Sequence, residues 1–330
     1  MKKLHFKTGL TLLLAVMFLG TASYAQKAEK EISNDYSISK GYTLDIENKY
    51  GSIEIVNWDQ DELSVVVHIE VEAASQAKAD KLLESIEINI SEEGKGVNYE
   101  TKIGETKLGN KTKIKVAYEV KAPAYMNVDL EQAYGNIFLQ AVTGEAHIEV
   151  RYGDLDATSI VRDDNEMNMI EIAYGNASIE QVGKLGVELA YSNLTVKESA
   201  ELNIESKYSN LTLGDIVKLE LESKYDKVKA SSLEESASIE AAYTNVTLGT
   251  ISSGFKTIQA EMAFGNLEAE LAPGASFRID ASASFGSIKI PDGDYSSTKE
   301  HNVHTVSGKI GDNPSAVVEA EFKYGSLKLK

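Results

Sequence analysis

The sequence predicts an all-β protein: a single-stranded right-handed β-helix, or β-solenoid, with coils of about 17–22 residues and a β-rich N-terminal cap that carries one short helix. Two observations support this prediction. A short aromatic-centred motif recurs at a nearly constant spacing along the chain. Around each copy, apolar and polar residues alternate as they do in a strand with one buried face.

The motif consists of an aromatic residue, then glycine or another small or polar residue, then usually Asn, Asp or Ser, then an aliphatic residue. From Tyr134 to Phe285 the copies are separated by 18, 22, 17, 17, 17, 18, 21 and 21 residues. A fixed period of about 20 residues is typical of stacked-repeat proteins. Besides an early copy at Tyr50, the aromatic positions are Tyr134, Tyr152, Tyr174, Tyr191, Tyr208, Tyr225, Tyr243, Phe264, Phe285 and Tyr324.

The direction of each side chain is predicted from the alternation. Leu202, Ile204 and Tyr208 occupy positions of one parity, so the aromatic residue is expected to point inward or to lie at an inner corner. Glycine and asparagine after the aromatic suit the tight bend that a coil needs. The asparagines two residues after an aromatic are expected to stack as a hydrogen-bonded turn ladder: Asn136, Asn176, Asn193, Asn210, Asn245 and Asn266.

The residue three positions before the aromatic is glutamate in ten of eleven copies, and its parity is opposite to that of the aromatic. Because unpaired carboxylates cannot be buried at low cost, this face is expected to be solvated. The simplest interpretation is a charged face that opposes aggregation. The alternative is a row of weak divalent-cation or cationic-partner sites. Any affinity for a cation is expected to be modest, since single evenly spaced carboxylates lack the clustered oxygens of a tight calcium site. The candidates are Glu171, Glu188, Glu205, Glu222 and Glu240.

Three segments are expected. Residues 1–25 resemble a secretory signal, with lysines followed by a short apolar run and small residues. Residues 26–125 form the β-rich cap, with strands expected at 63–71, 86–90, 97–103 and 114–120 and a helix at 75–85. Residues 126–330 form the solenoid repeats. The long interval between the last two aromatics is expected to hold a degenerate coil at Ser307-Gly308-Lys309-Ile310.

Composition limits the partners and the location. Loss of the first 25 residues, with three lysines and no acidic residue, moves the formal charge from -18 to -21, so nucleic acid and anionic membranes are disfavoured. The chain has no cysteine, and no later segment is long and apolar enough to span a bilayer. We expect an exported protein, periplasmic, on the cell surface or secreted, whose partner is a protein or glycan of the cell envelope.

The sequence favours a non-catalytic role. Some parallel β-helices cleave acidic polysaccharides, but such sites need acidic residues around a cation and a base beside them. No Ser/His/Asp grouping, P-loop or dinucleotide motif is present, and His301 and His304 are too few for a metal site. Three hypotheses follow, in order of preference: an adhesin-like binding or envelope protein, a cation-responsive structural rod, and a polysaccharide-active enzyme. No cofactor is expected, apart from a weakly bound divalent cation.

The chain resembles the bacterial putative-adhesin family, a group of β-strand repeat proteins of unknown function. The resemblance lies in the repeated Tyr-Gly-Asn-Ile type motif, in Asn57-Trp58-Asp59-Gln60-Asp61-Glu62 and in Val306-Ser307-Gly308-Lys309-Ile310-Gly311, and it covers most of the chain after the first 25 residues. It implies an exported, surface or periplasmic β-helix-like protein. It supplies no catalytic residue.

Overall fold

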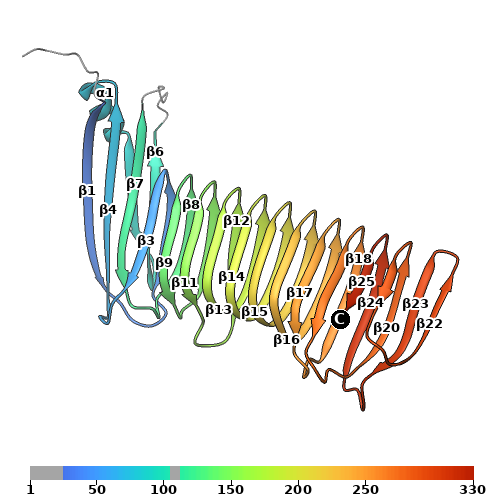
Figure 1. The fold of residues 1–330 in the computed structure, drawn as a ribbon. Helices are drawn as coiled ribbons and strands as arrows, with labels where there is room; N and C mark the ends of the chain where they lie inside the picture. Colours follow the sequence, from blue (N-terminus) through green and yellow to red (C-terminus); the bar gives the residue numbers. More distant parts are fainter. Residues whose placement is uncertain (1–24, 105–111) are drawn as a thin grey trace, which may run out of the picture.

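The computed structural model of the protein describes residues 25–104 and 112–330. Within these residues the chain forms 25 strands, all joined in one sheet, and one helix (Figure 1). The predicted all-β class is therefore confirmed. The predicted signal segment, 1–25, lies outside the described residues except for Ala25. None of the described helical structure is long and apolar enough to cross a membrane.

Most strands belong to two rows that meet at the aromatic residues. The first row contains strands that end just before an aromatic: β2 (Thr43–Lys49), β8 (Asn127–Ala133), β10 (Ala146–Arg151), β12 (Met167–Ala173), β18 (Thr257–Ala263), β20 (Phe277–Ser284) and β24 (Ala316–Lys323). The second row contains strands that begin just after one: β3 (Gly51–Asn57), β9 (Asn136–Val142), β11 (Asp154–Ile160), β17 (Asn245–Ile251), β19 (Asn266–Leu271), β21 (Ser287–Lys289) and β25 (Ser326–Leu329). Four long strands begin in the second row and end in the first: β13 (Asn176–Ala190), β14 (Asn193–Lys207), β15 (Asn210–Lys224) and β16 (Lys227–Ala242).

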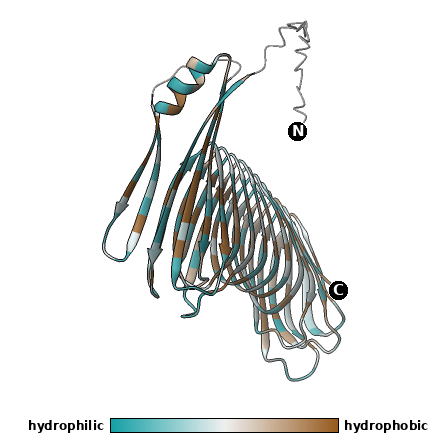
Figure 2. Ribbon diagram, turned by 90° about the vertical axis from the view of Figure 1, so that its left-hand side faces the viewer, coloured by the Kyte–Doolittle hydropathy of each residue, from teal (hydrophilic) through white to brown (hydrophobic). Residues whose placement is uncertain are grey.

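Successive coils pair in parallel and in register. Leu194 of β14 lies opposite Leu211 of β15, and Glu205 lies opposite Glu222, so each residue meets its counterpart one repeat later. The core lies between the two rows, where Leu202 and Ile204 of the first row and Leu211 and Leu213 of the second are at most 1% exposed. Viewed from its N-terminal side, the molecule is a series of nested coils (Figure 2). A single coil buries too little apolar surface to be stable, so its neighbours must complete the core.

The N-terminal region contains longer, antiparallel strands and the helix. β1 (Gln26–Ser37) pairs with β4 (Glu62–Ala73), and β4 pairs with β7 (Lys113–Ala122), both antiparallel. β5 (Ile86–Glu92) and β6 (Gly96–Ile103) form an antiparallel pair, and α1 (Gln76–Glu84) connects β4 to β5. The strands and the helix expected in this region are thus present. Figure 1 shows them as a taller block beside the first coils.

At both ends of the stack, the order of coils departs from the order of the sequence. β2 and β3, residues 43–57, lie between the strands of residues 127–142 and the outer strands β6 and β7. At the other end, β24 and β25 lie between β18 and β20 and between β19 and β21. The pair β2–β3 near the N-terminus and the pair β24–β25 near the C-terminus are therefore each covered by a further layer of strands.

The prediction of a degenerate coil at Ser307-Gly308-Lys309-Ile310 is wrong. These residues belong to β23 (Val303–Ile310), which pairs antiparallel with β20 and with β22 (Asp294–Glu300). A parallel coil needs an aromatic corner followed by a return along the other row. Here the chain instead reverses at His301, whose φ is +52°, and forms a hairpin. The spacing of a glycine and an aliphatic residue alone could not distinguish these alternatives.

Candidate functional site

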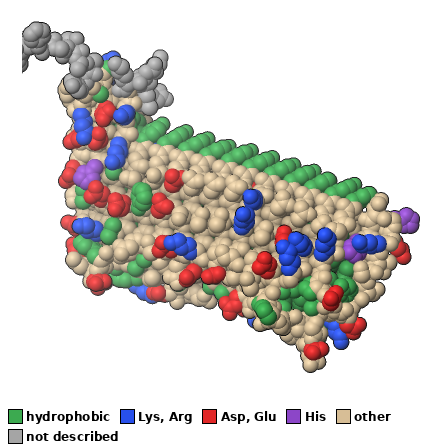
Figure 3. Space-filling view, in the orientation of Figure 1, with side chains coloured by type: hydrophobic (Ala, Val, Ile, Leu, Met, Phe, Trp, Pro, Cys, Tyr) green, Lys and Arg blue, Asp and Glu red, His purple; other side chains and the backbone are tan. Residues whose placement is uncertain are grey.

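The aromatic residues of the repeat form one continuous ladder on the outside of the molecule. In order along the stack its eleven members are Tyr50, Tyr134, Tyr152, Tyr174, Tyr191, Tyr208, Tyr225, Tyr243, Phe264, Tyr324 and Phe285. Apart from the half-buried Tyr50, the ladder residues are 45–56% exposed. Figure 3 shows them as an unbroken apolar ridge along one edge.

The prediction that these aromatics point inward is therefore wrong, although they do lie at a corner. Every ladder residue has a left-handed backbone, with φ between +53° and +63°. The alternation of side chains between two faces holds only while the backbone stays extended. At Tyr208 the left-handed residue ends that alternation, so its ring leaves the coil although Ile204, of the same parity, is buried.

The rings stack face to face. Neighbouring ring centroids are 4.7–5.2 Å apart and the ring planes differ by at most 15°. Ten such steps, each close to the separation of paired strands, make the ladder about 50 Å long. Because each ring covers the faces of its neighbours, the ladder presents ring edges and hydroxyl groups to solvent. Only Tyr50 and Phe285, at the two ends, lack a stacked ring on one face, and of these two only Phe285 is exposed.

The left-handed backbone at each corner would be less strained with glycine than with an aromatic residue. A left-handed conformation costs an L-residue about 1–2 kcal/mol, whereas each stacked aromatic pair contributes about 0.5–1.5 kcal/mol beyond the burial of its area. The two effects are of similar size, so stacking can offset the strain. The presence of an aromatic at all eleven corners indicates that the side chain, rather than the backbone, determines the residue at these positions.

A row of glutamates runs parallel to the ladder on the first row of strands. Each lies in register with the next, in the order Glu47, Glu131, Glu149, Glu171, Glu188, Glu205, Glu222, Glu240, Glu261 and Glu321. All of them are exposed or half-buried, as the alternation predicts. Partial burial, and then the carboxylates of Glu149 and Glu47, raise the pKa of Glu131 above its usual value.

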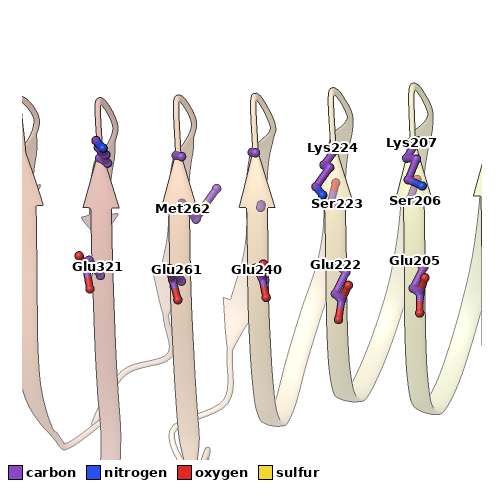
Figure 4. Close-up of a pocket in the computed structure, with 14 residues that line it drawn as sticks. Glu205, Ser206, Lys207, Glu222, Ser223, Lys224, Glu240, Glu261, Met262 and Glu321 are labelled. Carbon is purple, nitrogen blue, oxygen red and sulfur yellow. The ribbon is translucent and has the colours of Figure 1, made fainter.

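A shallow groove lies over the residues that occupy the three positions before each aromatic, the glutamate row included, and so adjoins the ladder along the chain. Two adjoining hollows of about 330 and 180 Å³ share Glu205, Ser206 and Lys207, and together they extend from Glu149 to Lys323. Figure 4 shows Glu205, Glu222, Glu240, Glu261 and Glu321 side by side on successive strands, with Lys207 and Lys224 closer to the corner. The glutamates of the groove form a continuous row. The position next to the corner is basic only at Arg151, Lys207, Lys224 and Lys323, and it is alanine in the coils between them.

The cation candidates Glu171, Glu188, Glu205, Glu222 and Glu240 all lie in this row, one per coil. Residues 25–104 and 112–330 contain no group of three or more His, Cys, Asp or Glu side chains arranged to hold a metal ion. His147 Nδ1 lies 3.0 Å from Asp129 Oδ1 and its Nε2 lies 3.9 Å from Glu171 Oε1, which makes it a local partner of the acidic row. Weak cation binding stays a prediction.

Amide side chains line the other flank of the ladder. Asn193 Nδ2 donates to Asn176 Oδ1 at 2.8 Å, and Asn210 Nδ2 donates to Asn193 Oδ1 at 3.0 Å. Asn266 makes the same bond to Asn245 at 2.9 Å. At Asn136 the backbone N–H of Asp154 donates to the side-chain oxygen at 3.0 Å. These bonds fasten successive corners to one another and so hold the rings at a constant spacing.

Sequence reasoning missed a buried polar column beneath the ladder. Where most coils have glycine after the aromatic, four central coils have Ser192, Ser209, Asp226 and Thr244, all at most 7% exposed. Each accepts a hydrogen bond from the corner of the preceding coil; Ser209 N, for example, donates to Asp226 Oδ1 at 2.6 Å. The replacement of glycine by hydroxyl and carboxyl residues in consecutive repeats was the signal that could have revealed it.

No protein-family model matches the chain, and no curated protein matches it. Several solved structures similar to it are named putative adhesins, and one, from Parabacteroides distasonis, is named a putative lipid binding protein. One from Bacteroides fragilis has 12% identity and a TM-score of 0.32 over 91% of this chain and 97% of its own. One from Parabacteroides merdae has 10% identity and a TM-score of 0.34 over 91% and 96%. A putative cell adhesion protein from Clostridium sporogenes has 10% identity and a TM-score of 0.19 over 92% and 99%.

These names agree with the family that the sequence resembles. Likenesses of such low identity and TM-score carry no argument about function, so the function must be argued from the surface of this chain. Fold and surface together define the class: an all-β repeat protein whose stacked coils carry an exposed aromatic ladder.

Proposed function

We propose that this protein is an exported, non-catalytic, right-handed β-solenoid that acts as an adhesin-like binding protein of the cell envelope through its tyrosine ladder. The observation that carries the proposal is the ridge of eleven stacked rings, ten of which are about half exposed. Monomeric proteins rarely expose a contiguous apolar patch of more than a few hundred Å², and larger patches usually mark interaction sites. A ridge about 50 Å long, with strained corners at every step, fits that description.

The parallel register of the coils supports the solenoid interpretation. Residues 26–125 act, in this proposal, as the cap of the first coil. Their antiparallel strands and α1 cover an end that would otherwise offer unpaired strand edges for aggregation. A rigid stack also suits a binding protein, because its corners cannot move independently of one another.

The ladder is preorganised for binding. Each inner ring lies between two others and has little rotational freedom to lose when a partner binds, which reduces the entropic cost of association. Tyrosine offers both apolar area and a hydroxyl group, the combination on which antibody binding sites depend. Because ring faces are covered along the ladder, sugars cannot stack on it as they do on isolated aromatics. A protein partner therefore fits this surface better than a glycan.

The test is adhesion of envelope material or cells of the native host to beads coated with residues 26–330. Beads with the wild-type protein are expected to retain cells, and beads with the triple variant Tyr191→Gly, Tyr208→Gly, Tyr225→Gly are expected to lose most of that retention. Glycine suits the left-handed corners, so the variant keeps its backbone. Phe138→Ser, which removes an exposed aromatic elsewhere, is the matched control. Equal retention by wild type and triple variant would overturn the proposal.

The glutamate row favours one second role, a cation-responsive rod. Ten carboxylates in register repel one another, and a divalent cation spread along the row would relieve that repulsion. Calcium is then expected to raise the melting temperature, and chelator to lower it again. Unchanged melting would dismiss this role. The non-catalytic part of the proposal is tested separately by incubation with acidic polysaccharides, where release of new sugar ends would contradict it.

A further inference from the structure

We propose that the partner of the tyrosine ladder is a second copy of this chain. In this arrangement the ladders of two molecules lie side by side, each seated in the groove that adjoins the ladder of the other. The inference rests on the proposed function, since it names the partner of the same surface. Three features of the molecule support it: the spacing of the rings, the chemistry of the groove and the area of the ridge.

The spacing restricts what can touch every ring. Successive ring centroids are 4.7–5.2 Å apart over ten steps. An extended peptide lying along the ladder repeats its side chains on one face about every 6.6 Å, two residues of about 3.3 Å each, and so falls out of step after a few rings. A second copy of the chain has the same spacing between coils. If one ring of the first copy contacts its counterpart site on the second copy, every other ring can make the same contact.

The groove supplies acceptors for the donors that the ladder presents. No hydrogen bond joins any of the nine ladder tyrosine hydroxyls to another protein group in the part of the chain that the structure describes. Seven glutamates of the neighbouring row likewise form no ion pair there: Glu131, Glu188, Glu205, Glu222, Glu240, Glu261 and Glu321. Donation from hydroxyl to carboxylate gives a short, charge-assisted hydrogen bond. Both rows advance by one residue per coil, so a partner's hydroxyls can meet these carboxylates one for one.

The area is sufficient for a dimer. An aromatic side chain buries about 150–250 Å², so ten half-exposed rings offer roughly 1,000 Å² on each molecule. A stable interface of standard size needs about 800 Å² from each partner. The negative charge of the two molecules opposes association, so the dimer is expected to strengthen when salt screens that repulsion. A partner attracted by the glutamates would show the opposite salt dependence.

The experiment measures the mass of residues 26–330 by sedimentation equilibrium over a range of protein concentrations, at about 0.05 and about 0.5 M NaCl. The wild type is expected to form dimers, more strongly at the higher salt. The triple variant Tyr191→Phe, Tyr208→Phe, Tyr225→Phe keeps the stack and loses three hydroxyls, so its dissociation constant is expected to rise roughly ten-fold or more. The corresponding triple glycine variant is expected to be monomeric, and Phe138→Ser to dimerise normally.

A direct measurement of the arrangement uses the absence of cysteine from the chain. A spin label on Lys227→Cys, two residues after the ladder residue Tyr225 and outside the groove, is expected to come within measurable distance of its counterpart in the dimer. A label on Lys78→Cys in α1 serves as a reference away from the ladder. A wild type that is monomeric at every concentration overturns the inference, as does a dimer that survives the triple glycine substitution. If cells adhere in a ladder-dependent way while the protein is monomeric, the inference fails and the proposed function stands. If a ladder-dependent dimer forms but adhesion is independent of the ladder, the proposed function fails instead.

Discussion

Replacement of Tyr208, the middle ring of the ladder, by glycine and by alanine separates the two effects that act at each corner. Its ring is stacked at 4.9 Å on Tyr191 and at 5.0 Å on Tyr225. Either substitution removes both contacts, which costs about 1–3 kcal/mol. Alanine keeps the left-handed strain of about 1–2 kcal/mol, whereas glycine is free of it. Glycine in turn loses about 0.5–1 kcal/mol more than alanine through the entropy of the unfolded chain.

The midpoints of these two ranges predict that Tyr208→Gly is more stable than Tyr208→Ala by about 0.75 kcal/mol, with both variants less stable than the wild type. At an ordinary exposed strand position, Thr212, the order reverses, and glycine is less stable than alanine by about the same amount. Urea unfolding followed by circular dichroism measures all four variants. Amide exchange at Tyr208, whose N–H donates to Lys224 O at 3.1 Å, localises the effect. If alanine proves equal to or better than glycine at position 208, the reasoning about strained corners is wrong.

Three further predictions concern other parts of the stack. Gly153→Ala is expected to destabilise by about 1–3 kcal/mol, because the new Cβ would lie 1.8 Å from Gly135 O. At Gly254 the nearest atom to a new Cβ is Ser252 Oγ at 3.9 Å, an ordinary contact, so Gly254→Ala is expected to be neutral in the same denaturation assay. Asp226→Ala leaves the buried N–H of Ser209 without its acceptor and is expected to cost about 1–3 kcal/mol; Asp226→Ser, which copies neighbouring coils, is expected to restore most of the melting temperature. The pKa of Glu131 is raised in the folded protein, so ionisation of this carboxyl opposes folding. The stability that the protonated carboxyl contributes is fully present below the unfolded-state pKa, and it is lost as pH rises through the folded-state pKa. Glu131→Gln is thus expected to raise the melting temperature at pH 7 and to leave it unchanged at pH 3.

The sequence predicted the all-β class and the solvated side of the first row of strands, because both depend on an alternation that is repeated in many strands. Glu205 faces solvent as the alternation requires, and Leu202 is buried. The direction of Tyr208 could not be predicted from that alternation, because a single left-handed residue changes the geometry on which it relies. The alternation therefore predicts that the ladder lies in the core, whereas the structure shows its edges exposed.

Other errors had a different origin. The spacing between motifs predicts the number of coils but not their order along the stack. The position of Tyr324 between Phe264 and Phe285 therefore could not be predicted from the intervals. The hairpin of β22 and β23 (Asp294–Ile310) could not be predicted for a related reason, since a glycine and an aliphatic residue occur in turns of many kinds. Which strands pair along the stack depends on contacts between residues far apart in the sequence, and a local sequence pattern cannot predict such contacts.

The interleaving of the end coils determines when the molecule can be completed. β20 and β21 leave the ribosome before β24 and β25, yet they are separated from β18 and β19 by those later strands. The C-terminal layer can therefore reach its final pairing only after almost all of the polypeptide has been synthesised. A chain truncated before residue 316 would have to leave these strands apart or join them in a contact absent from the native protein. If the protein is exported, the chain would stay incompletely folded until its C-terminal strands have been synthesised, that is, during the period in which it is transported.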